Sequence, residues 1–140
     1  MGITDADSAE HAGESTNLII APVACPVPNR RDGAPKLSGS CRLMIQPATR
    51  LSGVYRAREV QEQYFCNYEV NPAYYEDFRR SGLALTAFDE TGALRAAELP
   101  DRRFFVATLF QPQLSSSEGA PHPLIVEFLA AAADGPARPS

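Results

Sequence analysis

The sequence lacks most of the signals that mark a specialised class of protein. It has three cysteines and two histidines in 140 residues, and none of them forms the closely spaced C-x-x-C or H-x-x-x-H pair that zinc sites use. An odd number of cysteines in a chain without a secretion signal also argues against a disulfide framework. We therefore expect no metal, no cofactor and a reduced, cytoplasmic environment.

Long apolar runs and an excess of basic residues are missing as well. No stretch approaches the roughly 20 apolar residues that cross a bilayer, and the start has no basic segment followed by an apolar run. The formal net charge is −4, and the sequence shows no basic patch of the kind that binds nucleic acid. The run Arg102-Arg103, with Arg95 nearby, is the nearest approach, and we expect that run to form a solvated turn before a buried strand. Nucleic-acid and membrane partners are not expected.

What is present is the pattern of one modest domain. At 44% hydrophobic residues the chain can bury a core, between an acidic N-terminal segment at 1–16 and a tail at 134–140. The continuous apolar run at its last strand is typical of burial on both faces. The predicted strands are Leu18–Ala21, Arg42–Gln46, Glu62–Val70, Leu83–Phe88, Ala93–Glu98 and Phe104–Phe110. The predicted helices are Asn71–Gly82 and Leu124–Ala133, and Pro26–Gly39 is predicted to be a loop.

Several motifs occur in a fixed order and spacing. They are Tyr-Glu-Val-Asn at 68–71, Glu-Leu-Pro at 98–100, Phe-Gln-Pro-Gln at 110–113 and His-Pro-Leu at 122–124. From about Asp5 to Ala132, this order resembles the C-terminal half of the class I glutamine amidotransferase domain of CTP synthases. The resemblance implies an α/β fold: a partial amidotransferase-like, flavodoxin-like mixed sheet with flanking helices, formed here by residues 17–133.

The residues that would carry the chemistry of this family are exchanged. The family strand ends in Phe-His-Pro-Glu, where the histidine is the general base and the glutamate orients it, and these two slots hold Gln111 and Gln113. The Gly-x-Cys-x-Gly motif of the nucleophile does not occur in the sequence. Cys41 follows one glycine, lacks the second and lies in the wrong part of the family order. We therefore expect no Cys-His-Glu triad and no glutaminase activity.

A ligand site is still conceivable at the same place. Glu10 resembles the family glutamate that receives the α-ammonium group of glutamine, a role for charge-assisted hydrogen bonding. Gln111 and Gln113 offer amide donors and acceptors to a polar ligand. However, the family's arginine-rich run before Tyr-Glu-Val-Asn is Gln63–Asn67 here and contains no cation. A small amino-acid-like ligand is therefore a hypothesis, with Glu10, Gln111 and Gln113 as its candidate contacts.

Two cysteines are candidates for thiol chemistry. Cys25 follows a predicted strand and lies between two prolines. The pattern Pro-x-Ala-Cys around it resembles the degenerate CTP synthase C-terminal-region-related (seleno)proteins. In that group this slot can hold selenocysteine, which implies a redox or nucleophilic use of Cys25. Cys66 is the weaker candidate, because a thiol among aromatic residues is typical of a core.

Three interpretations stay open. The chain is an amidotransferase-like protein that uses Cys25 or its old pocket, a non-catalytic interaction module, or a truncated fragment of a CTP synthase. The part of the domain that the sequence does not match contains central strands, so the matched part would expose a sheet edge and an apolar face. We accordingly expect a homo-oligomer or a partner chain that supplies the missing half.

Overall fold

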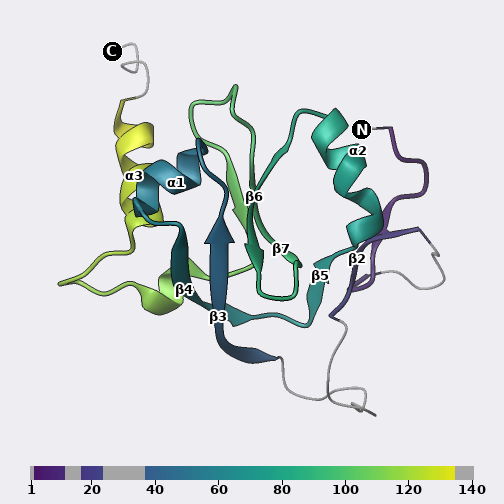
Figure 1. Ribbon diagram of the computed structural model, residues 1–140, viewed down its shortest axis with the longest axis horizontal. Helices are drawn as coiled ribbons and strands as arrows, with labels where there is room; N and C mark the ends of the chain where they lie inside the picture. Colours follow the sequence, from purple (N-terminus) through teal and green to yellow (C-terminus); the bar gives the residue numbers. More distant parts are fainter. Residues whose placement is uncertain (1, 12–16, 24–36, 135–140) are drawn as a thin grey trace.

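The computed structural model describes residues 2–11, 17–23 and 37–134, which form two sheets and three α-helices (Figure 1). The five-stranded sheet is antiparallel throughout, in the spatial order β4 (Glu59–Phe65), β3 (Ser38–Ile45), β6 (Ala84–Asp89), β7 (Leu94–Glu98) and β8 (Val106–Thr108). The three-stranded sheet contains β1 (Asp7–Ser8), β2 (Leu18–Pro22) and β5 (Tyr68–Val70). Because β1 and β2 are parallel and β2 and β5 antiparallel, this second sheet is mixed. The predicted α/β class is confirmed.

Helices cover both faces of the larger sheet. On one face lie α1 (Arg50–Tyr55) and α3 (Pro123–Ala133), packed against each other, and on the opposite side lies α2 (Tyr75–Arg80) beside the smaller sheet (Figure 1). Short 3₁₀ turns precede two of these helices in the chain, η1 (Pro72–Tyr74) before α2 and η2 (Pro112–Ser115) before α3. Within the described ranges, none of these helices has the length and hydropathy needed to span a membrane.

Local sequence explains where the helices begin and end. The predicted helix after β5 begins where the side chain of Asn71 accepts a hydrogen bond from Ala73 N and ends before Gly82, whose φ of 90° favours glycine. Helix α1 was not predicted, because Gly53 weakens a six-residue pattern. It forms because Thr49 and Ser52 make a reciprocal capping box at its N-terminus.

Each face of the five-stranded sheet has its own apolar cluster. The cluster under α1 and α3 contains Leu43, Ile45, Leu51, Ala87, Ala96, Phe110 and Leu124. The cluster under α2 contains Phe78, Leu85, Leu94 and Ala97, with Ile19 and Val70 from the smaller sheet packed against it. The larger sheet is therefore the middle layer of the molecule.

Three predicted elements differ from the structure. Glu62–Val70 is not one strand, because the chain leaves β4 at Phe65 and enters the other sheet at Tyr68. The strand predicted from Arg42 begins at Ser38, since its polar first half pairs with β4. The predicted strand Phe104–Phe110 is reduced to β8, which is not buried on both faces, because Val106 packs against the cluster under α1 and α3 while Ala107 on the other face is exposed.

Candidate functional site

The strand-end position of the family motif is occupied by Gln111, three residues after the end of β8 and just before η2. Its backbone N–H donates to Gln63 O at 2.8 Å, and its side-chain Nε2 donates to Phe65 O at 3.1 Å. Both acceptors belong to β4, the opposite edge of the sheet, so the sheet curls until the chain after β8 meets β4. The Gln111 amide is a structural link between these two edges.

The structure does not gather the other predicted residues around Gln111. Gln113 lies in η2 with an exposed side chain. Glu10 lies in an exposed turn, where its backbone N–H donates to Ser8 Oγ at 3.3 Å. Among the described residues, no hydrogen bond or ion pair joins Glu10, Gln111 and Gln113 to one another. Cys25 lies outside the described residues.

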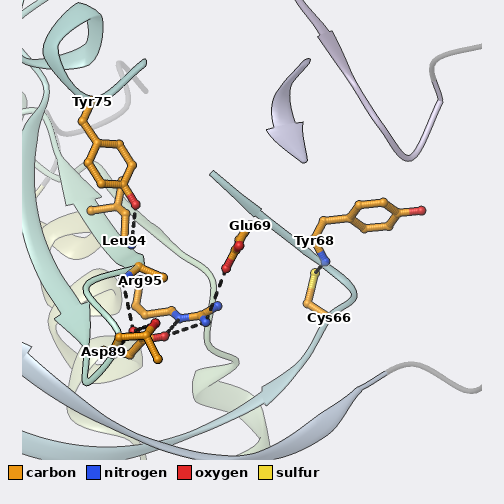
Figure 2. A network of polar contacts seen from close by, with 9 residues as sticks. Cys66, Tyr68, Glu69, Tyr75, Asp89, Leu94 and Arg95 are labelled. Carbon is orange, nitrogen blue, oxygen red and sulfur yellow. Dashed lines mark hydrogen bonds and ion pairs between the residues drawn. The ribbon is translucent and has the colours of Figure 1, made fainter. Parts of the chain in front are cut away.

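Cys66 is a half-buried thiol at the bend between β4 and β5. Its Sγ accepts a hydrogen bond from Tyr68 N at 3.4 Å (Figure 2), and its backbone N–H donates to Leu37 O at 3.0 Å. The neighbouring Asn67 holds the same segment, because its Oδ1 accepts from Leu37 N at 2.8 Å and its carbonyl accepts from Val23 N at 2.8 Å. These contacts anchor the backbone on both sides of the bend.

A polar pocket of about 530 Å³ opens between the first half of β3, β5 and the β6–β7 hairpin. Arg95 lies at one wall, with its guanidinium between two carboxylates (Figure 2). Its NH2 group is 2.6 Å from Asp89 Oδ2 and 3.9 Å from Glu69 Oε2. Cys41 and Arg42 from β3 line another wall. The pocket, called the polar pocket below, therefore offers both signs of charge and a thiol.

Hydrogen bonds organise the hairpin side of this pocket. Asp89 Oδ1 accepts from Thr91 N at 2.9 Å, Thr91 Oγ1 at 2.6 Å and Ala93 N at 3.0 Å, while Arg95 Nε donates to Oδ2 at 2.7 Å. Burial alone would raise the pKa of Asp89, but the bonds from Thr91, Arg95 and Ala93 outweigh it and hold that pKa below its usual value. Burial raises the pKa of the Cys41 thiol. The carboxylate is thus ionised and the thiol protonated near neutral pH.

Arg95 lies in β7, within the predicted strand Ala93–Glu98, and its side chain is 13% exposed. This burial was not predicted. The available signal was a charged residue within an apolar strand pattern, which requires an opposite charge nearby when it is buried. Arg102 and Arg103 are exposed, as predicted.

A second polar cluster is buried under α1 and α3. It joins Tyr55 at the end of α1, Glu62 on β4 and His122, the N-cap of α3. Tyr55 Oη donates to Glu62 Oε1 at 2.5 Å, and His122 Nε2 lies 2.9 Å from the same oxygen. Burial, and then the bond to Glu62, raise the pKa of Tyr55 far above its usual value.

The geometry fixes the tautomer of His122. Its Nδ1 accepts from Leu124 N at 3.2 Å, so in the neutral ring the proton is on Nε2 and is donated to Glu62. The other oxygen, Glu62 Oε2, is buried without a partner among the described residues. His122 was predicted to be structural, and these contacts confirm it. Glu62 was missed, although it occupies an inward position of an alternating strand.

Chemically, the described residues offer binding groups and no general base at the strand end. His122 is 4% exposed and engaged at both nitrogens. His11 lies in the exposed turn near Glu10. In the part of the chain that the structure describes, no group of three or more His, Cys, Asp and Glu side chains is placed to hold a metal ion.

Comparisons with known proteins agree on one family, although no family model matches the chain. A CTP synthase from Methanopyrus kandleri is 34% identical over 143 aligned positions, which cover 97% of this chain and 26% of that protein. A CTP synthase from Rhodococcus opacus is 36% identical over 94% of this chain and 24% of its own length. The chain thus spans about a quarter of the curated relatives it matches.

A solved structure narrows the match to one domain. The glutaminase domain of the Trypanosoma brucei CTP synthase, determined with bound acivicin, superimposes with a TM-score of 0.84 and 33% sequence identity. The match covers 98% of this chain and 54% of that chain. This chain therefore belongs with the glutaminase domains of the CTP synthases, as a partial class I glutamine amidotransferase domain.

Proposed function

We propose that this chain is an amidotransferase-like protein that does not hydrolyse glutamine. The observation that carries the proposal is the state of Gln111, which stands where the family strand ends in its catalytic histidine. Its amide donates to Phe65 O, and an amide does not accept a proton near neutral pH and so does not activate a thiol as a general base. His122, buried against Glu62, has no part in that site.

The recognition of glutamine is expected to be weakened as well. The segment Gln63–Asn67 carries no cation to pair with a substrate carboxylate. Asn67, the residue just before Tyr-Glu-Val-Asn, uses its side-chain oxygen to hold Leu37 N. Charge-assisted bonds are roughly twice as strong as neutral ones, so their absence removes the strongest contact that an amino-acid carboxylate would make there.

Glutamate release from glutamine tests this proposal. We expect no release above the buffer control, and we expect no complex of the chain with acivicin in native mass spectrometry. Glutamate release that disappears in Cys25→Ala or in Cys66→Ala would overturn the proposal, because it would show a working thiol nucleophile. His11→Ala is the matched control for any participation of an exposed histidine.

In place of hydrolysis, we propose binding of a small amino-acid-like ligand in the polar pocket, with Cys25 as the reactive thiol. Support comes from the pocket wall, where Arg95 lies between the carboxylates of Asp89 and Glu69, so that groups of both signs line the pocket. Further support is the position of Val23, which lines the pocket and precedes Cys25 by two residues in the sequence.

Alkylation by iodoacetamide measures the thiol part of the proposal. The thiolate attacks the CH₂ carbon and iodide leaves, so the rate follows the thiolate fraction. We expect Cys25 to react with an apparent pKa below about 8.5, the value for a free cysteine, and Cys41 to react slowly, because burial raises its pKa. If Cys25 reacts no faster than Cys41 and Cys66, the thiol role fails. The chain is then best described as a non-catalytic interaction module or a fragment of a CTP synthase.

A further inference from the structure

The outer edge of β8 has no partner strand among the described residues. β8 pairs with β7 alone, in the register Ala96 to Thr108, Ala97 to Ala107 and Glu98 to Val106. On either side of β8, the pairing continues through Leu99 N to Phe105 O at 3.3 Å and Leu109 N to Arg95 O at 2.8 Å. Because bonding residues alternate along an antiparallel strand, the odd-numbered residues bond to β7. The N–H and C=O groups of Val106 and Thr108 therefore point away from the sheet.

An apolar pocket of about 230 Å³ lies beside this edge. Ala107 in β8 and Leu109 just after it line the pocket on one side, and Ile20, Val70 and Phe78 line it from β2, β5 and α2. Val106 packs on the other face, against the cluster under α1 and α3. By the same alternation, Phe105 lies on the face of Ala107 and Leu109, and its side chain is 42% exposed. An exposed aromatic ring and an apolar pocket thus share one face of one strand.

We propose that β8 pairs with β8 of a second copy of this chain, antiparallel about a two-fold axis at Ala107. In this register Val106 of each copy lies opposite Thr108 of the other, so all four outward backbone groups of each copy are hydrogen-bonded. Phe105 of one copy then lies opposite Leu109 of the other and covers its apolar pocket. The smallest side chain of the strand, Ala107, faces its own copy at the axis.

The sequence of the edge favours a second copy as the occupant. Residues 105–109 are Phe-Val-Ala-Thr-Leu, without the lysine, proline or inward charge that usually protects an edge strand. The side chain that fits the pocket is carried by the same strand, four residues from Leu109, so the contact is self-complementary, as a two-fold interface requires. A two-fold axis at Val106 or Thr108 would place Phe105 away from Leu109.

Sedimentation equilibrium of the chain and of two matched variants tests whether two copies pair through β8. We expect a monomer–dimer equilibrium whose dissociation constant rises at least about tenfold in Phe105→Ser, as for a buried aromatic anchor. Phe128→Ser is the control, because Phe128 is 53% exposed on α3 and packs against Phe104, on the other face of the sheet from Phe105. A chain that is monomeric at every concentration, or a dimer that Phe128→Ser dissociates and Phe105→Ser does not, overturns the proposal.

A cross-linking experiment tests the register. In a chain whose Cys25, Cys41 and Cys66 are replaced by serine, Ala107→Cys is expected to form a disulfide-linked dimer on mild oxidation. The two side chains lie opposite each other in a non-hydrogen-bonded pair, where Cα atoms are about 4.5 Å apart. Val106→Cys, which faces the core, is expected to stay unlinked. Equal cross-linking of the two variants, or no cross-linking of Ala107→Cys, overturns the register. Ala107→Cys would also stay unlinked if a segment from outside these 140 residues paired with β8 in place of a second copy.

Discussion

Polar side chains have different roles in two regions of the five-stranded sheet, the layer under α1 and α3 and the chain that follows β8. Under α1 and α3, Glu62, Glu98 and His122 are all less than 5% exposed and bonded to groups from other elements. At the end of β8, Gln111 is half-buried, Gln113 is exposed, and the bond from Gln111 goes to the backbone of β4. The buried polar groups hold helices on the sheet, whereas the position that carries catalysis in the family holds a neutral connection between strands.

The polar residues that stabilise the fold are therefore different from those at the strand-end position where the family has its catalytic residues. Glu98 shows it clearly, because its two carboxylate oxygens accept from Arg50 N at 2.8 Å and Leu51 N at 3.3 Å and so cap α1. A negative charge at a helix N-terminus is favourable, and the contact spans almost 50 residues of sequence. Such long-range polar contacts are costly to break, so we expect substitutions under α1 and α3 to have the larger effects on stability.

The largest effect is expected for His122→Ala. The substitution leaves Glu62 buried with only Tyr55 as a partner and removes the N-cap of α3. Loss of one member of a buried pair of this kind costs about 3–5 kcal/mol, which urea denaturation followed by circular dichroism would measure at pH 7. His11→Ala, in an exposed turn, should change the free energy of unfolding by less than about 0.5 kcal/mol. Equal losses for the two substitutions would show that the buried contacts of His122 stabilise the fold no more than the exposed turn of His11 does.

The next largest effect is expected for Glu98→Ala. Two backbone N–H groups at the start of α1 lose their acceptor, and an unsatisfied buried donor costs about 1–3 kcal/mol. Glu127→Ala is the matched control. Glu127 is half exposed, and its carboxylate forms a long surface ion pair with Arg50 NH1, at 3.9 Å. Such surface pairs contribute about 0–1 kcal/mol to stability. Urea denaturation would measure both losses in the free energy of unfolding, from the shift of the midpoint between curves of equal slope. A larger loss in the control would place the stabilisation of α1 at its exposed side.

Much of the fold was predictable because its signals are local. The hairpin around Gly92, the helix after Asn71 and the C-terminal helix each follow from nearby residues, and the structure confirms them. The division of Glu62–Val70 between two sheets was not predictable, since Tyr64 and Tyr68 have similar strand propensities and only tertiary pairing separates them. That a glutamine, Gln111, follows β8 was visible in the sequence, because one residue type decides it. The Arg95 and Glu62 contacts were not, because they depend on distant partners.

Acid is expected to reduce the contribution of Asp89, in the polar pocket, to the free energy of unfolding. The pKa of Asp89 is held below its usual value in the folded state, so the carboxylate stabilises the fold above the unfolded pKa of about 3.9. This contribution is lost as pH falls through the lower, folded pKa. Asp89→Asn should therefore cost about 1–2 kcal/mol at pH 7 and progressively less from pH 5 towards pH 2. Asp101→Asn, at an exposed side chain, should show no such pH dependence in thermal melts.

The smallest effect is expected for Gln111→Ala. The backbone bond from Gln111 N to Gln63 O survives the substitution, and the side-chain bond to Phe65 O is a neutral one at a partly solvated site. We therefore expect the free energy of unfolding to fall by about 0.5–1 kcal/mol, which urea denaturation would measure. Gln113→Ala is the matched control, because the side chain of Gln113 is exposed and its loss should leave this free energy unchanged. A loss above about 2 kcal/mol would mean that the Gln111 amide closes the curled sheet as firmly as Glu62 and His122 hold the helices. The strand end would then be a structural joint, and its departure from the family motif would have a cause in folding rather than in lost chemistry.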